Sequence, residues 1–373
     1  MARIVRKYGG SSLREPEQIR QVAKYIADMS WNGDQVVVVV SAMAATTDEL
    51  LSMARSLHPD PPRREMDMLL SVGERISCAL LAMAIEAEGV NAISYTGSQV
   101  GIITDTHHGE ARIVDVRPTR LLQALEQGQV VVVAGFQGVS IDKEITTLGR
   151  GGSDATAIAL AAAIKADRCE LMKEVQGLHT ANPTAVPNAE LIEVLDFDSA
   201  LRLARGGAKA LQSEAARLAL DHHVPLAIGN SATDSIGTIV TDRPFDCGEI
   251  VGIARRDKIV RQQGVGEVPP TDGWSRFVEQ NGRWVLWREA KPEETAALSG
   301  VTVVTSGRSV EGLHRCVVNT LTQADINVQG IVESQEEMWI CVSTEQAVPA
   351  EHLLHEAIQK SGWFRTDNRN RAE

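Results

Sequence analysis

Residues 148–164, LGRGGSDATAIALAAAI, place an arginine, several glycines, a serine and an aspartate directly before an alanine-rich helical segment. Glycines let a backbone approach a ligand closely. The first turn of a helix offers unpaired N–H groups and a partial positive charge to an anion. Arg150 adds a planar guanidinium that suits a carboxylate or a phosphate. The segment therefore predicts a site for a negatively charged group.

A second candidate anion site lies in KYGGSS, residues 7–12, at the end of the first expected strand. Lys7 and the backbone N–H groups that follow it can meet phosphate oxygens together. A lone lysine in such a place is more often a surface residue, so this reading needs other support. The Walker A pattern GxxxxGK[ST] does not occur in the sequence, which excludes an ordinary P-loop protein.

Four other residues each have a structural and a functional interpretation. Glu74 lies inside the apolar helical pattern MLLSVGERISCALLAM and either faces solvent or holds an amino group. Ser41 and Thr47 flank a predicted helix start and could be N-caps. Asp154 is either an acid of the first helical turn or a residue that orients lysines or a metal–nucleotide complex.

These residues are to be positioned by short aliphatic strands that alternate with helices. Runs such as VVVVV are typical of strands buried on both faces, so an α/β sandwich with a parallel sheet is expected. Small polar residues follow four strands, in KYGGSS, VVSAMAATTD, VAGFQG and AIGNSATD. They either turn the chain or converge on one site, because ligands bind beyond the carboxyl ends of such strands. Strands are expected at 3–8, 35–41, 91–95, 101–104, 130–134, 168–172 and 224–229, and helices at 16–29, 47–57, 62–87, 117–127, 152–165, 197–205 and 208–221.

Composition describes a globular protein of 373 residues, 43% of them hydrophobic, with a formal charge of −12. This charge argues against a broad surface for nucleic acid or an anionic membrane. The five cysteines lack metal-site spacing, so no metal-ligating residues are predicted and a reducing compartment is expected. The longest aliphatic run, 36–40, is far short of a membrane span, and a cytoplasmic protein is expected. The histidine pairs 107–108 and 222–223 are expected at the surface.

After residue 243 the sequence changes character, and all but one of the tryptophans lie beyond that point. A strand–helix–strand–strand–helix order is expected from residue 301 to about 360. It predicts a small second domain. The segments 250–263 and 272–288 weakly suggest an earlier copy of the same unit.

The motifs KYGGSS, VVVSAMAATTDELL, GERIS, TGSQVGIITD, EITTLGRGGSDATAIALAAA and GAKAL occur in the order typical of one family. Over residues 2–242 the chain resembles the aspartate kinases of the amino-acid kinase superfamily. The resemblance implies a three-layer α/β/α sandwich in 1–243. It further implies an ACT-like α+β regulatory domain in 244–373, with an eroded first unit and a second unit at about 300–362.

The resemblance also implies a role for each candidate residue. Lys7 would neutralise the transferred phosphoryl group, and Asp154 would organise the site. Arg150 and Ser153 would hold the substrate carboxylate, and Glu74 its ammonium group. The remaining implied positions are Ser41, Thr47 and Phe136 in the substrate pocket and Gly9, Gly10, Ser11, Lys173, Glu174, His179 and Lys209 near the nucleotide.

The segment KEVQGLHTANPT, residues 173–184, departs from the family pattern TDVDGVYTADPR. Lys173 replaces a threonine, and Thr184 replaces an arginine that usually reaches the nucleotide. Loss of such a charge-assisted contact costs about 1.5–3 kcal/mol, and Lys173 restores one positive charge nearby. Glu174, Gln176, His179 and Asn182 also differ from the family pattern.

The function implied is phosphorylation of the L-aspartate side chain by ATP with Mg²⁺, giving 4-phospho-L-aspartate for lysine, threonine and methionine biosynthesis. Two alternatives stay open: a related kinase with another acceptor or nucleotide, and an amino-acid-binding regulatory protein without catalysis. A homodimer or higher homo-oligomer and an amino-acid effector at the ACT-like domain are also expected. Nucleic-acid and membrane partners are not expected.

Overall fold

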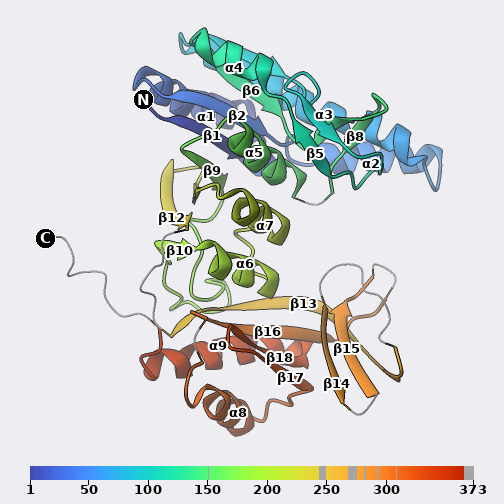
Figure 1. Cartoon of the computed structure of the whole chain (residues 1–373), viewed down its shortest axis with the longest axis vertical. Coiled ribbons are helices and arrows are strands. Elements are labelled where there is room, and N and C mark those ends of the chain that lie inside the picture. The colour runs from blue at the N-terminus through green and yellow to red at the C-terminus, as the bar shows by residue number, and fades with distance from the viewer. Residues whose placement is uncertain are drawn as a thin grey trace, which may run out of the picture. The chain divides into compact units, whose positions relative to one another are not determined.

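The computed structural model describes residues 1–149, 151–242, 249–267, 275–280, 283–291, 294–307 and 309–364. The chain forms two compact units, Met1–Gly177 with Glu214–Asp242, and Leu178–Ser213 with Arg243–Glu373 (Figure 1). This division into units differs from the single boundary expected at 243. The difference arises because residues 178–213 cluster with the C-terminal region rather than with the first unit. Each unit is described by itself below.

The first unit is built on one parallel sheet. Its strands lie in the order β12-β11-β9-β1-β2-β6-β3, and β12 alone runs antiparallel to its neighbour. The valine-rich strands β2 and β6 are almost entirely buried, as their sequences predict. The bounds are β1 (Arg3–Tyr8), β2 (Gln35–Val40), β3 (Ala92–Tyr95), β6 (Val130–Ala134), β9 (Arg168–Lys173), β11 (Leu226–Asn230) and β12 (Ser235–Thr241).

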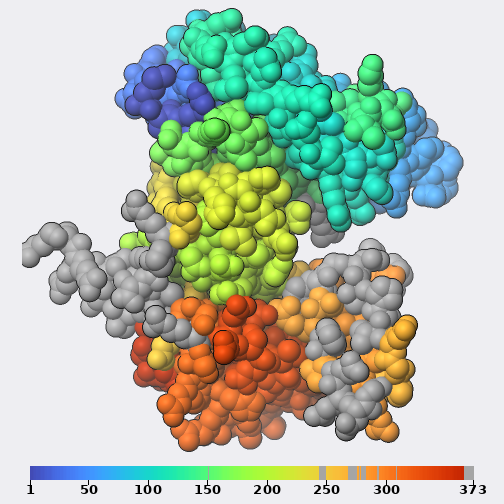
Figure 2. Space-filling model, in the orientation of Figure 1, coloured from blue at the N-terminus to red at the C-terminus, as the bar shows by residue number. Residues whose placement is uncertain are grey.

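Helices cover both faces of this sheet and confirm the expected three-layer sandwich. Alternate side chains of the strands pack with α1 (Pro16–Trp31) and α3 (Arg63–Ala87) in one core. The helix α5 (Gly152–Ala163) contacts β1, β2 and β9, next to the strand residues that face away from that core. The other helices are η1 (Gly10–Leu13), α4 (Thr119–Glu126) and α7 (Ser213–His222), with α2 (Thr46–Leu57) at the surface in light blue (Figure 2).

The helix α3 is long and apolar enough to cross a membrane by length and composition alone, although 44% of its most apolar window is buried inside the fold. It also carries two buried carboxylates, Asp67 and Glu74, which meet polar groups of the same unit. Both features are those of a core helix.

A second, smaller sheet in this unit has the order β5-β4-β7-β8. Its strands are β4 (Ile102–Thr104), β5 (Ile113–Val116), β7 (Gln137–Ser140) and β8 (Ile145–Thr147). Only the strand at 101–104 was expected, because three- and four-residue strands with polar residues give little periodicity. β8 ends at Thr147, directly before the glycine-rich segment.

The second unit contains β10 (Val194–Asp196), α6 (Phe197–Gly206) and an antiparallel sheet of order β14-β15-β13-β16-β18-β17. The helices α8 (Leu313–Gln323) and α9 (Thr344–Lys360) pack on one face of that sheet (Figure 1). The expected strand–helix–strand–strand–helix order is confirmed, although α9 begins six residues earlier than expected. The strands are β13 (Ile250–Val265), β14 (Ser275–Gln280), β15 (Arg283–Glu289), β16 (Leu298–Thr305), β17 (Gly330–Glu333) and β18 (Glu337–Ser343).

The close approach of the loops after β1 and β2 gives a test of the fold. A Cβ atom on Gly10 would lie 2.3 Å from the carbonyl oxygen of Ala42, whereas one on Gly9 would find only ordinary contacts at 3.8 Å or more. Gly10→Ala should therefore lower the free energy of unfolding by about 1–3 kcal/mol. Gly9→Ala is the matched control and should change it by less than about 0.5 kcal/mol. Denaturant unfolding of both variants measures the difference, and equal stabilities would contradict the described packing.

Candidate functional site

The carboxyl ends of β1, β2, β6 and β11 lie at one edge of the central sheet, because these strands are parallel to one another. The polar segments that follow these four strands therefore lie at one edge of the sheet, as the second of the two interpretations requires. β1 is the middle strand, with β2 and β6 on one side and β9 and β11 on the other. A residue near the end of β1 thus lies between two groups of loops.

Lys7 is that residue, and its ammonium group is held by Asp154. The distance from Lys7 Nζ to Asp154 Oδ1 is 2.7 Å, and Lys173 Nζ lies 2.8 Å from the other oxygen, Oδ2. Asp154 is in the first turn of α5, and Lys173 ends β9. One carboxylate therefore bridges two ammonium groups that come from adjacent parallel strands.

Burial and charge set the protonation states of this bridge. Burial alone would raise the pKa of Asp154, but Lys7 and Lys173 outweigh it and lower the pKa to about 2. Burial lowers the pKa of Lys7, and the positive charge of Lys173 lowers it further, while Asp154 opposes both. The site concentrates positive charge in a protein whose net charge is negative, and the two ammonium groups are suited to an incoming anion.

Glu74 brings a carboxylate to the same edge from α3. A Cβ atom on the preceding Gly73 would lie 2.8 Å from Ala42 Cβ, so the glycine lets the helix approach the loop after β2. Glu74 Oε1 accepts a hydrogen bond of 3.1 Å from Ala42 N. Its Oε2 is buried without a hydrogen-bond partner within the described part of the chain. Burial raises the pKa of Glu74 to about 7, against the smaller effects of that hydrogen bond and of Lys7.

Such an orphaned carboxylate oxygen is costly unless a donor reaches it. A ligand with an ammonium group would satisfy Glu74 Oε2 and would favour its ionised form.

Ser153 and Phe136 lie together at the ends of α5 and β6. A Cβ atom on Gly135, between β6 and Phe136, would be 3.0 Å from Ser153 Cβ. Phe136 has a left-handed φ of 65°, and Thr156 Oγ1 accepts a hydrogen bond from its N–H. Arg150, which is expected to form the carboxylate clamp together with Ser153, lies outside the described residues.

Ser41 directly follows β2, and Thr47 lies in the first turn of α2. The N-cap of α2 is Ala45, so neither residue has the capping role that the sequence left open. Both stay candidates for the substrate pocket.

A cavity of about 290 Å³ lies on the side of β1 where β9 and β11 end, away from the side of Glu74. Its polar lining includes Ser11, Ser12 and Glu174. Asn230 and Ser231, which also line it, were not predicted as site residues, although the segment AIGNSATD marks the end of their strand. Ser12 donates a 2.8 Å hydrogen bond to Ser231, and the N–H of Ser231 donates to Lys173 O at 2.7 Å. The cavity is therefore connected through the backbone to the Asp154 bridge.

Two expected nucleotide residues, His179 and Lys209, belong to the second unit, and their roles stay predictions. His107 is exposed as expected, but the same expectation is wrong for His108. Its side chain is only 23% exposed because its Nδ1 lies 2.6 Å from a carboxylate oxygen of buried Asp67 on α3.

The model of the "Amino acid kinase family" matches residues 2–230, which is more than half of the chain. The chain belongs to the amino acid kinase family.

An aspartokinase of Mycolicibacterium smegmatis is 51% identical over 276 residues, which cover 72% of this chain and 66% of that relative. The match thus spans just under two thirds of the length of that relative. A crystal structure of aspartate kinase from Synechocystis is 31% identical, with a TM-score of 0.60, and the match covers 100% of this chain and 71% of that one. E. coli aspartokinase III in complex with aspartate and ADP has the same fold, with 20% identity and a TM-score of 0.84 over 95% of this chain and 99% of that one.

The bridging carboxylate leads to a stability prediction. Asp154→Asn leaves two buried ammonium groups facing each other, so we expect the free energy of unfolding to fall by about 3–5 kcal/mol at pH 7. Asp154→Asn combined with Lys173→Met should recover part of this loss, because it removes the repulsion. Denaturant unfolding of wild type, the single variant and the double variant measures both effects. A single variant as stable as the wild type would contradict the bridge.

Proposed function

We propose that the chain is an aspartate kinase that transfers the terminal phosphoryl group of ATP to the side-chain carboxylate of L-aspartate. The product would be 4-phospho-L-aspartate. The observation that carries the proposal is the position of the Lys7–Asp154–Lys173 bridge. The bridge lies at the end of β1, the middle strand. Glu74 lies beyond it near the loop after β2, and the cavity lies beyond it near the loops after β9 and β11. The likeness to the aspartokinases of Mycolicibacterium smegmatis and Synechocystis supports the choice of substrate.

On the substrate side, Glu74 Oε2 would accept the ammonium group of aspartate. Ser153 and Arg150 would hold the α-carboxylate at the start of α5, where the helix dipole favours an anion. Ser41, Thr47 and Phe136 would line the remaining surface.

The reaction needs charge screening more than it needs a base. An aspartate side chain is already ionised at neutral pH. The obstacle to the reaction is repulsion between this carboxylate and the negatively charged triphosphate. Two like unit charges 4 Å apart repel each other by about 4 kcal/mol at an effective dielectric constant of about 20. Lys7, fixed by Asp154, would stand at the transferred phosphoryl group and lower this repulsion as negative charge builds up in the transition state. Asp154 keeps Lys7 in place.

On the nucleotide side, the cavity would take part of ATP. Its lining of hydroxyl, amide and carboxylate groups suits a nucleoside with hydrogen-bonding edges. Gly9, Gly10 and Ser11 would present backbone N–H groups to the phosphates, and Lys173 would supply the charge that Thr184 lacks. Glu174 completes the proposed nucleotide set within the first unit.

Mg²⁺ would further neutralise the triphosphate. Both oxygens of Asp154 are already held by lysines. Within the described residues, no group of three or more His, Cys, Asp or Glu side chains is placed to hold a metal ion. These observations fit an ion that arrives on the nucleotide.

The second unit would serve regulation as an ACT-like domain that binds an amino-acid effector and joins two copies of the chain. Its β16-α8-β17-β18-α9 order and the fold match to E. coli aspartokinase III with lysine and aspartate support this assignment. The product would feed lysine, threonine and methionine biosynthesis in the cytoplasm.

The direct test is aspartate-dependent release of ADP from Mg-ATP by the purified chain. Lys7→Ala should lower kcat by at least about 100-fold, because it removes a preorganised charge from the transition state. Lys24→Ala removes an exposed lysine of α1 and is the matched control, with kcat unchanged. Aspartate binding without any release of ADP would refute the kinase and favour a regulatory binding protein. Turnover with another acceptor would refute aspartate as the substrate.

The raised pKa of Glu74 predicts the pH dependence of aspartate binding. A carboxyl group with a pKa of about 7 is increasingly protonated as the pH falls below 7, and its neutral form attracts an ammonium group only weakly. The KM for aspartate should therefore rise about tenfold for each pH unit well below 7. Glu74→Gln should raise KM at pH 8 and remove this dependence. The KM of both proteins between pH 5.5 and 8 checks it, and identical pH profiles would contradict the role of Glu74.

A further inference from the structure

Asp67 is a buried carboxylate that the proposed reaction does not use. It lies on α3 about two helical turns before Glu74, so both side chains share one face of the helix. Its exposed fraction is 0%. A carboxylate buried to this extent is kept only where hydrogen bonds replace its water.

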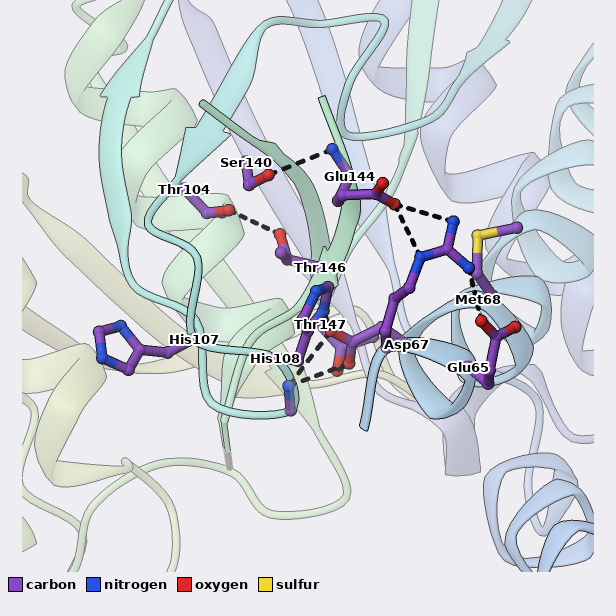
Figure 3. Close-up of polar contacts among 12 residues, drawn as sticks. Glu65, Asp67, Met68, Thr104, His107, His108, Ser140, Glu144, Thr146 and Thr147 are labelled. Atoms are coloured by element: carbon purple, nitrogen blue, oxygen red, sulfur yellow. Dashed lines mark hydrogen bonds and ion pairs between the residues drawn. The ribbon is translucent and has the colours of Figure 1, made fainter. Parts of the chain in front are cut away.

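Three partners supply those hydrogen bonds (Figure 3). Thr147 donates its hydroxyl group to Asp67 Oδ1 in a short bond. His108 Nδ1 lies 2.6 Å from Oδ2, and Gly109 N donates to both oxygens at 3.1 and 3.2 Å. His107 points away from the cluster. Asp67 thus ties the loop after β4 and the end of β8 to α3.

Thr147 leads from this anchor toward the substrate residues. The next residue, Leu148, donates its N–H to Phe136 O at 2.9 Å. A Cβ atom on Gly152, the first residue of α5, would lie 2.7 Å from Leu148 Cβ and 2.9 Å from Phe136 Cδ2. Leu148, Phe136 and Gly152 are thus closely packed. Because little room is left between them, we expect a displacement of Thr147 to displace Leu148, Phe136 and the start of α5 as well. Ser153 is the next residue of that helix.

We propose that Asp67 is a positioning residue that fixes Leu148, Phe136 and the start of α5 relative to α3. The inference rests on the proposed function, which assigns Phe136 and Ser153 to the aspartate pocket. The helix α3 would then position the residues that meet both ends of the substrate. Glu74 meets the ammonium group, and Asp67, through Thr147, places the residues that meet the carboxylate.

The neighbouring strand residue provides a matched control. Thr146 is equally buried, but its hydroxyl group pairs with Thr104 at 2.6 Å inside the small sheet and away from Asp67 (Figure 3). Replacing Thr146 or Thr147 by valine removes one buried hydroxyl group from β8 in each case. Only the second change breaks the connection to α3.

The experiment measures KM for aspartate, KM for ATP and kcat in Thr147→Val, Thr147→Ser, Thr146→Val and Asp67→Asn, together with aspartate binding by calorimetry. We expect Thr147→Val and Asp67→Asn to raise KM for aspartate and its dissociation constant by about tenfold, with KM for ATP within about twofold of wild type. Thr147→Ser keeps the hydroxyl group and should restore the wild-type values. Thr146→Val should leave both KM values unchanged.

The other possible outcomes distinguish a failure of the positioning role from a failure of the proposed function. If Asp67→Asn does not fold, Thr147→Val decides the question. Unchanged aspartate binding in Thr147→Val, or equal losses for both substrates, overturns the positioning role and leaves the proposed function standing. A serine variant as impaired as the valine variant also overturns it. A wild-type protein that neither binds nor phosphorylates aspartate refutes the proposed function, and this inference falls with it.

Discussion

The account depends on one carboxylate, Asp154, that holds two ammonium groups at the end of the middle strand. Its distances to Lys7 and Lys173 are 2.7 and 2.8 Å, and the side chains of all three residues are largely buried. An acidic protein that brings two anions together must fix positive charge between them, since mobile surface lysines lose rotamer entropy when they are ordered. The bridge orders both lysines before any ligand binds. The proposed chemistry therefore depends more on preorganised charge than on a proton acceptor.

The fold explains why these groups meet. Parallel strands end at one edge, and the order β11-β9-β1-β2-β6 puts Lys7 between the side of the cavity and the side of Glu74. α5 brings Asp154 to that edge, and α3 brings Glu74, whose approach depends on the glycine before it. The two helices lie on opposite faces of the sheet, so each contributes its charge from its own layer.

Much of this could be predicted from sequence, because aliphatic strands and glycine-rich strand ends are local signals. The runs at 35–41 and 130–134 predicted buried parallel strands, and Lys7, Glu74 and Asp154 could be identified as candidates for the proposed site. Their partners could not. The contact of Lys173 with Asp154 joins residues 19 positions apart through the order of the strands. The pairing of Asp67 with His108 depends on the loop between the short strands β4 and β5, and β5 has no clear period in its sequence. His108 therefore resembled a surface histidine until its partner in α3 was known.

The most direct test of the central claim is a crystal structure of the chain with aspartate and a non-hydrolysable ATP analogue. The account predicts the aspartate ammonium group on Glu74 Oε2 and the terminal phosphate within hydrogen-bond distance of Lys7. The side-chain carboxylate should then face the phosphorus at about 3–3.5 Å. Phosphates bound away from Lys7, or an aspartate whose ammonium group is turned from Glu74, would contradict it.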